Sequence, residues 1–304
     1  MTAKPPVIIV ENVTKKFGKF NAVDAINFAV KTGEIVGFVG VNGAGKTTTI
    51  NMLLGFTSPT EGSLSLFGEQ VKLPSSHRSH RHIGYAAGDM ELPARMTGRQ
   101  YIQFVASQYE GDHTKHLTYL TKIFSPQLDK KISTLSRGNK QKIALVAAFL
   151  TKPSLVVLDE PTSGLDPIMQ DVFLQLVREE RDRGTTIFMS SHYLQEVAEV
   201  CTRVLLMKNG KIVEDLSSEQ LQETSGKTVR LISATKAEPP HRGVSVVEHS
   251  KSDGGYQLSF VYKGKIADLQ SWIVRQTDVI DIDISERTLE AEFRALYQND
   301  GAAK

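Results

Sequence analysis

The 304-residue sequence has little of several features that would narrow its class. A single cysteine, Cys201, excludes an intrachain disulfide framework and is typical of a reducing compartment. The 36 basic and 34 acidic side chains leave a net charge of only +2, so the composition gives no indication of nucleic-acid binding. No apolar run approaches the roughly 18–20 residues that a membrane-spanning helix needs, and we expect that the chain does not cross a bilayer.

Apolar runs and turn signals divide the sequence into a large first part and a small second part. In the first part, short apolar runs typical of buried parallel strands alternate with stretches of helical spacing, which favours an α/β fold. A mostly helical segment occupies about residues 89–150, and the composition turns polar and poorly patterned near residues 217–227. We therefore expect one domain over residues 1–223 and a small α+β domain over residues 224–304. The second domain is predicted to end in a helix with one apolar face, formed by Leu289, Phe293 and Leu296.

A glycine-rich segment follows the apolar run Ile35–Val39 and precedes a predicted helix. It matches the pattern G-x-x-x-x-G-K-[ST] with the residues Gly40, Val41, Asn42, Gly43, Ala44, Gly45, Lys46 and Thr47. Glycines allow the backbone to turn successive N–H groups toward phosphate oxygens, and the positive end of the following helix adds to this anion site. Lys46 has the length to reach the β- and γ-phosphates of ATP, and the Thr47 hydroxyl is a suitable Mg²⁺ ligand. A chance match is the alternative, but the strand-to-helix context disfavours it, and we expect ATP to bind along Gly40 to Thr48.

A second apolar run, Leu155–Leu158, ends in two acidic residues, Asp159 and Glu160. Carboxylates at the C-terminal edge of a parallel strand lie where ligands bind in open α/β sheets. There Asp159 is placed to hold Mg²⁺, and Glu160 to orient or activate a water molecule for attack on a phosphate. Taken alone, the pair is also compatible with a polar cap at the end of a strand. Its position downstream of a phosphate-binding loop favours the catalytic interpretation.

Four segments, together with the phosphate-binding loop, indicate one particular family of ATPases. Asp159–Asp166 resembles the joined Walker B and D-loop of ABC (ATP-binding cassette) ATPases, and Leu135–Gln141 resembles their signature motif. Ser190–His192 resembles the switch-histidine segment of the family, and Phe17 matches the aromatic residue that stacks on adenine. The resemblance covers about residues 7–215 and keeps the family's order and spacing. It implies a P-loop NTPase core of the ABC type with an antiparallel β layer and an inserted helical subdomain.

The resemblance also implies roles for individual residues. Ser136 and Gly138 would contact nucleotide held by an opposite subunit, so that two chains close head-to-tail around two ATP molecules. His192 would contact the γ-phosphate, and Asp166 would couple the two sites. The alternatives are purely structural: Ser136 would only cap its helix, and His192 would be an ordinary core histidine. The length of the matching series favours the functional interpretation of both residues.

Two motifs depart from the family pattern. The signature has Arg137 where a glycine is usual and Asn139 where a glutamine is usual, while its serine and second glycine are kept. We therefore expect contact with the opposite phosphate to survive. Gly88 stands at the usual glutamine of the Q-loop, which removes a side-chain contact to Mg²⁺ and to the membrane partner. We hypothesise that water or the neighbouring Asp89 fills this part of the metal site.

The resemblance predicts an ATP-binding and ATP-hydrolysing subunit that energises transport by a separate transmembrane permease. It would work with a second copy of itself on the cytoplasmic side, at the inner face of the cell membrane. Similarity to stand-alone subunits of drug, lipid or polysaccharide exporters favours export, and an importer subunit is the near alternative.

A soluble ABC ATPase acting on ribosomes or DNA is the alternative from another class. One P-loop, no heptad run and near-neutral charge disfavour it, so no nucleic-acid partner is expected. A degraded cassette that binds ATP without hydrolysing it is a third interpretation.

Overall fold

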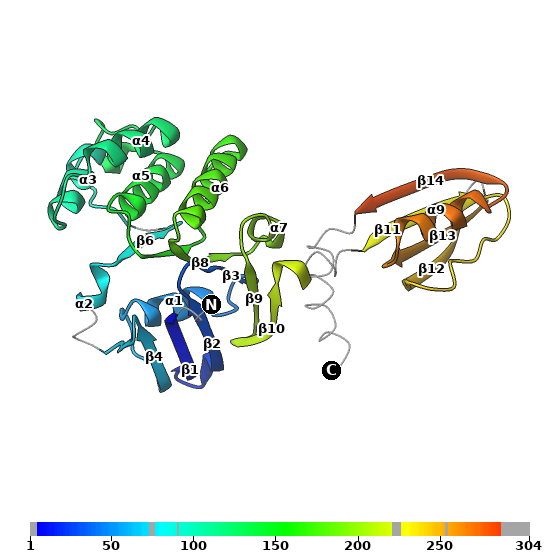
Figure 1. Cartoon of the computed structure of the whole chain (residues 1–304), viewed down its shortest axis with the longest axis horizontal. Coiled ribbons are helices and arrows are strands. Elements are labelled where there is room, and N and C mark those ends of the chain that lie inside the picture. Colours follow the sequence, from blue (N-terminus) through cyan, green and yellow to red (C-terminus); the bar gives the residue numbers. More distant parts are fainter. Residues whose placement is uncertain (1–4, 73–76, 90, 221–225, 253–254, 287–304) are drawn as a thin grey trace. The chain divides into compact units, whose positions relative to one another are not determined.

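The chain forms two compact units, Met1–Ser217 and Ser218–Lys304. The computed structural model describes residues 5–72, 77–89, 91–220, 226–252 and 255–286 (Figure 1). The division between the units lies a few residues before the boundary expected after residue 223. The first unit contains two β-sheets and the second unit contains one, and each unit has its own apolar core.

A six-stranded sheet in the order β10-β9-β3-β8-β7-β6 forms the centre of the first unit. Its strands are β3 (Ile35–Val39), β6 (Ile83–Ala87), β7 (Leu155–Asp159), β8 (Thr186–Ser191), β9 (Arg203–Lys208) and β10 (Lys211–Ser217). All run parallel except β10, which returns antiparallel to β9 after the turn at Asn209 and Gly210. Every residue of β3 and β7 is buried, as expected for apolar strands covered on both faces. The predicted α/β class is confirmed.

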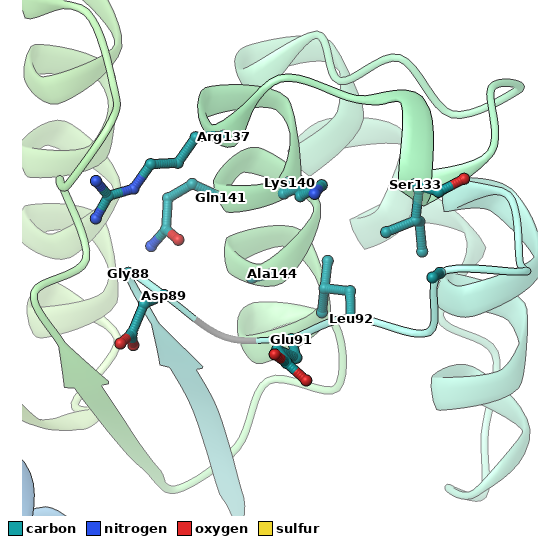
Figure 2. Close-up of a pocket in the computed structure, with 11 residues that line it drawn as sticks. Gly88, Asp89, Glu91, Leu92, Ser133, Arg137, Lys140, Gln141 and Ala144 are labelled. Carbon is teal, nitrogen blue, oxygen red and sulfur yellow. The ribbon is translucent and has the colours of Figure 1, made fainter.

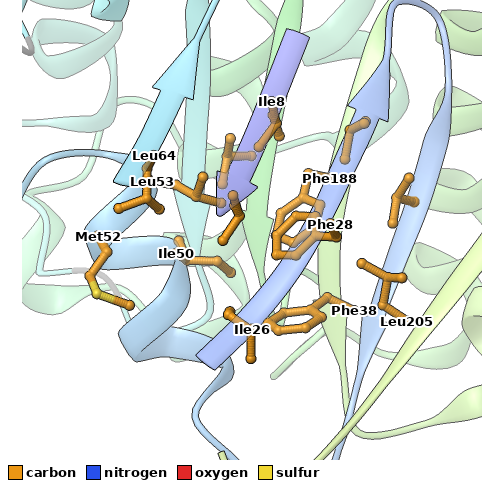
Figure 3. Packing of buried hydrophobic residues seen from close by; sticks show 14 of the residues in the cluster. Ile8, Ile26, Phe28, Phe38, Ile50, Met52, Leu53, Leu64, Phe188 and Leu205 are labelled. Carbon is orange, nitrogen blue, oxygen red and sulfur yellow. The ribbon is translucent and has the colours of Figure 1, made fainter. Parts of the chain in front are cut away.

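A four-stranded antiparallel sheet in the order β2-β1-β4-β5 shares a core with the central sheet. Its strands are β1 (Pro6–Phe17), β2 (Phe20–Lys31), β4 (Glu61–Leu66) and β5 (Glu69–Gln70). The rings of Phe28 in β2 and Phe188 in β8 stack with centroids 5.6 Å apart, and Phe38 of β3 lies 5.3 Å from Phe188 (Figure 3). These contacts join the two sheets, and the predicted antiparallel layer is confirmed.

Helices connect the strands of the first unit: α1 (Lys46–Leu53), α2 (His77–His80), α3 (Gly98–Ser107), α4 (Thr114–Phe124), α5 (Arg137–Phe149), α6 (Pro167–Asp182) and α7 (Leu194–Ala198). The helices α3, α4 and α5 form the segment predicted to be helical over about residues 89–150 (Figure 1). Ser136 and Asp166 are the N-caps of α5 and α6, and each side chain accepts a hydrogen bond from the backbone of the first turn. In the described part of the chain, no helix is both long enough and apolar enough to pass through a bilayer.

The second unit is an antiparallel sheet in the order β12-β13-β11-β14 with a helix packed on it. Its elements are β11 (Lys227–Ser233), β12 (Val244–Ser252), β13 (Gly255–Tyr262), α9 (Ile266–Val274) and β14 (Val279–Glu286). Trp272 of α9 meets the Phe260 ring edge-on at a centroid distance of 5.2 Å. The helix predicted at Leu289, Phe293 and Leu296 lies outside the described residues.

Replacing Phe188 by alanine tests the contact between the two sheets of the first unit. Phe188 is fully buried between Phe28 and Phe38, so the change leaves a cavity and should lower the free energy of unfolding by about 3–5 kcal/mol. Chemical denaturation followed by circular dichroism measures this loss. The control Phe104→Ala removes a ring that is 52% exposed and should cost less than about 1 kcal/mol. Equal losses in the two variants would contradict the role of Phe188.

Candidate active site

The glycine-rich loop joins β3 to α1 and needs its glycines for space as well as for backbone torsion. Gly45 has a φ of 109°, and a Cβ atom there would lie 2.3 Å from the carbonyl oxygen of Ala22 in β2. A Cβ atom at Gly40 would lie 2.5 Å from the carbonyl oxygen of Met207 in β9. Gly43, at a φ of 82°, has no atom within 4 Å of the position of a Cβ. The loop is therefore pressed against β2 and β9 at its two ends and is open at its middle.

Lys46 lies inside this loop rather than on the surface. Its side chain is buried, and its Nζ donates a hydrogen bond to the carbonyl oxygen of Gly40 at 2.6 Å. The other loop residues predicted to surround ATP lie along the open side or at the start of α1: Val41, Asn42 and Gly43 are exposed, Ala44 is buried, Thr47 is exposed and Thr48 is half-buried. A fixed ammonium group beside an exposed backbone is the arrangement that binds phosphate oxygens.

Asp159 ends β7 beside the loop. Its carboxylate accepts a hydrogen bond from the hydroxyl of Ser190, at the end of β8, and the Thr47 hydroxyl lies close enough to influence its pKa. Burial raises the pKa of the Asp159 carboxyl, while the two hydroxyls act in the opposite direction. The predicted metal ligands Thr47 and Asp159 thus lie close together. Ser190 is not among the predicted site residues, although its place at the C-terminal end of the neighbouring strand is the signal that identifies it.

Glu160 lies between a cation and a histidine. Its Oε1 is 3.2 Å from Lys46 Nζ, and its Oε2 is 2.5 Å from Nδ1 of His192. The backbone at Glu160 has a φ of 50°, and its N–H donates to Ser190 Oγ at 3.0 Å, which holds the turn out of β7. The His192 ring packs on Tyr193 with centroids 4.0 Å apart. The two predicted catalytic side chains are therefore in direct contact with each other and, through Lys46, with the loop.

The remaining predicted residues lie at the surface of the first unit. Ser136 is exposed, and its Oγ accepts a hydrogen bond from Asn139 Nδ2 at 3.2 Å. Gly138 follows in the first turn of α5, Asp166 is exposed at the start of α6, and Phe17 ends β1 with 56% of its surface exposed. Among the described residues, no hydrogen bond or ion pair joins these four predicted residues to Lys46 or Glu160. Their predicted roles require bound nucleotide or a second subunit.

Comparison with known proteins decides the family. Residues 23–163, which include the loop, Asp159 and Glu160, match the family model described as ABC transporter. An uncharacterized ABC transporter ATP-binding protein of Bacillus subtilis, YhaQ, is 34% identical over 73% of this chain and 74% of its own length. The bacitracin transport ATP-binding protein BcrA of Bacillus licheniformis is 31% identical over 94% of this chain and 96% of its own length. The chain belongs to the ABC transporter family.

The fold of this ABC protein also has a solved counterpart. The structure of an ATP binding subunit of an ABC transporter is 27% identical, with a TM-score of 0.66, over 71% of this chain and 92% of its own. Together with the assembled loop and acidic pair, the family membership identifies the chain as an ATP-binding protein and an ATPase.

Gly88 and Arg137, two of the residues that depart from the ABC pattern, line the same cavity. A Cβ atom at Gly88 would lie 2.6 Å from the carbonyl oxygen of Glu160 and 2.8 Å from Cβ of Ser163. A glutamine at this position therefore does not fit unless the loop after Glu160 moves. Gly88, Asp89 and Arg137 line a cavity of about 520 Å³ beside α5 (Figure 2). Asp89 is exposed, and its part in the metal site stays a hypothesis.

Replacing Lys46 by alanine should abolish ATP binding or nearly so. Hydrogen bonds to charged groups contribute about 1.5–3 kcal/mol each, so affinity should fall by at least about 10-fold. Equilibrium binding of a fluorescent ATP analogue to the purified chain measures this loss. Lys122→Ala, on the exposed side of α4, is the matched control and should bind as the unmodified chain does. Unchanged affinity in Lys46→Ala would remove Lys46 from the site.

Proposed function

We propose that this chain is the ATP-hydrolysing subunit of an exporter whose membrane-spanning part is a separate permease. The observation that carries the proposal is the direct contact of Glu160 with Lys46 and His192 beside the glycine-rich loop. The similarity to BcrA, a bacitracin transport ATP-binding protein that matches nearly the whole chain, supports export of a drug-like cargo. Lipid and polysaccharide cargo are the other candidates in this group. The permease would hold the chain at the inner face of the cell membrane.

Mg²⁺ fits the oxygen donors that meet at the end of β7. The Thr47 hydroxyl and the Asp159 carboxylate are ligand types that this ion prefers, and the two lie close together. Asp159 is only 4% exposed, so a divalent cation would offset the electrostatic cost of its ionised form. Thr47 and Asp159 would hold the ion together with phosphate oxygens of ATP. The ion would neutralise negative charge that develops on the phosphates during hydrolysis.

Lys46 changes partner when ATP binds. Its Nζ is 3.2 Å from Glu160 Oε1, and phosphate oxygens entering the loop compete for the same ammonium group. The exchange releases one oxygen of Glu160, which then accepts a hydrogen bond from the attacking water. His192 keeps the other oxygen in place and, by family resemblance, contacts the γ-phosphate. Binding of ATP and release of the base are thus linked through a single carboxylate.

Two copies of the chain would close head-to-tail around two ATP molecules. Ser136 is exposed at the N-terminus of α5, where free backbone N–H groups and the helix dipole favour an anion. Ser136 and Gly138 of one copy would meet the phosphates held by the other copy. Asp166, exposed at the N-terminus of α6, would relay closure from one site to the other. Closure and reopening would drive the permease between inward-facing and outward-facing states.

An aromatic groove on the first unit is the surface that we assign to the permease. The groove encloses about 210 Å³ and is lined by side chains that include Phe56, Tyr85, Tyr101 and Tyr109. The Phe56 ring is 58% exposed and meets the Tyr85 ring edge-on at 5.9 Å. Tyr85 belongs to β6, which leads directly to Gly88 beside the loop after Glu160. A permease segment in this groove would therefore press on a strand that ends at the active site.

Replacing Glu160 by glutamine should keep ATP binding and trap the dimer. The amide keeps the shape of the side chain but cannot act as a base, so turnover stops while closure around ATP remains possible. Phosphate release and the molar mass in solution with ATP measure the two effects. Glu199→Gln, an exposed change in the same unit, should hydrolyse ATP normally. Turnover retained in Glu160→Gln would remove Glu160 from the mechanism.

Capture of the partner tests the transporter proposal itself. The tagged Glu160→Gln chain is recovered with ATP from detergent-solubilised native membranes, and a polytopic membrane protein in near-equal amount is the expected result. Adding Phe56→Ser to the tagged chain should reduce recovery of that protein without changing ATP binding. Recovery of ribosomes or DNA-associated proteins would instead favour the soluble class of ABC ATPase.

A further inference from the structure

Arg137 reaches from the signature motif to the loop that follows Glu160. Its Nη2 donates a hydrogen bond to Ser163 Oγ at 2.7 Å. A Cβ atom at Gly164 would lie 3.0 Å from Cγ and 3.2 Å from Cδ of Arg137, so the stem of the arginine lies directly against Gly164. The guanidinium and its stem therefore both contact residues 161–166, the D-loop of this chain.

The first turns of α5 hold the D-loop at two further points. A Cβ atom at Gly138 would lie 2.6 Å from the carbonyl oxygen of Gly164, so glycine is required for this approach. Gln141, which is 3% exposed, donates from Nε2 to the carbonyl oxygen of Pro161 at 2.7 Å. Figure 2 shows Arg137 and Gln141 leaving α5 toward the same side, with Gly88 nearby. Contacts at Pro161, Ser163 and Gly164 thus tie the D-loop to α5 within one subunit.

Gly88 completes this arrangement from the other side. Because a Cβ atom at Gly88 would lie 2.8 Å from Cβ of Ser163, any side chain there would push Ser163 away from its present position. Ser163 would then no longer accept the hydrogen bond from the Arg137 guanidinium. The glycine at position 88 and the arginine at position 137 are therefore structurally matched, although they are far apart in the sequence.

We propose that Arg137 is a positioning residue, and that its bond to Ser163, the Arg137–Ser163 bridge, makes the signature motif and the D-loop move as one body. Ser136 and Asp166 would then move together toward the opposite subunit when two subunits close. This role rests on the proposed head-to-tail dimer. Arginine suits it because its planar guanidinium is always charged and its long stem packs on Gly164 while the donors reach a hydroxyl.

Hydrogen exchange in the isolated chain tests the bridge without any dimer. Arg137→Met keeps most of the stem and removes the donors, and Ser163→Ala removes the acceptor. In both variants, the backbone amides of residues 160–166 should exchange hydrogen faster, by roughly threefold or more, because a charged hydrogen bond is lost. The double variant should resemble either single variant, since both changes break the same bond. Arg99→Met, which breaks the exposed Arg99–Asp129 pair in the same helical segment, should leave this exchange unchanged.

Steady-state kinetics tests the positioning role. Arg137→Met and Ser163→Ala should lower kcat by roughly fivefold or more and weaken the ATP-induced dimer in the Glu160→Gln background. The affinity of the isolated chain for MgADP and its Tm should stay close to those of Arg99→Met. A purely structural role of Arg137 would instead lower Tm and nucleotide affinity together.

The outcomes separate the bridge from the proposed dimer. Unchanged exchange over residues 160–166 would overturn the bridge. Faster exchange with unchanged or increased kcat would overturn the positioning role, as would a fall in MgADP affinity that accompanies the loss of kcat. A Glu160→Gln chain that stays monomeric with ATP would contradict the head-to-tail dimer and with it the positioning role, whereas the exchange result would still decide the bridge.

Discussion

The parallel register of β3, β8 and β7 is the constraint on which the geometry of the active site depends. Val39 lies opposite Ser191, and Ser190 lies opposite Asp159, so the glycine-rich loop, the serine and the acidic pair leave the sheet at the same edge. A slip of one residue in β7 would turn Asp159 to the other face of the sheet. The buried rings of Phe38 in β3 and Phe188 in β8 pack on each other, and Phe188 stacks on Phe28 of β2, which helps to fix the register of β3 and β8.

The charges that meet at this edge balance one another before any ligand arrives. Lys46 and Glu160 form a pair at 3.2 Å, and the other oxygen of Glu160 contacts His192. Leaving one member of a buried pair without a partner is costly, so entry of ATP is favourable only if each group receives a new partner. The phosphates supply one for Lys46, and the attacking water supplies one for Glu160. A further acidic residue, Glu196, lies next to the site: its Oε2 accepts a hydrogen bond from Ser191, and burial raises the pKa of its carboxyl.

Sequence reasoning could predict the features that depend on short stretches of chain. The loop pattern identified Lys46 and Thr47, and the apolar run before Asp159 located the strand that carries it, because both signals are local. The assignment of Asp159 to the metal site rested on the rule that ligands bind at the C-terminal edge of parallel strands. The partners of Glu160 depend on side-chain orientation after folding, and no spacing rule gives them. Ser190, in contrast, is identifiable from its place at the C-terminal end of the strand beside β7. β12 has no clear sequence signal, because Val246, Val247 and the polar residues after them do not alternate as a half-buried strand would.

The departures in the signature and the Q-loop also have a meaning that the sequence pattern alone does not give. When each position is compared with the family separately, Gly88 and Arg137 look like two unrelated substitutions. In the folded chain, the space left by the absent side chain at position 88 is adjacent to Ser163, which is bound by the side chain gained at position 137. Residues inside the chain's own site are held by buried strand ends, whereas Ser136 and Asp166 are exposed helix N-caps. Exposed caps have no core to position them, so side-chain contacts between α5 and the D-loop must supply the rigidity that the sheet supplies elsewhere.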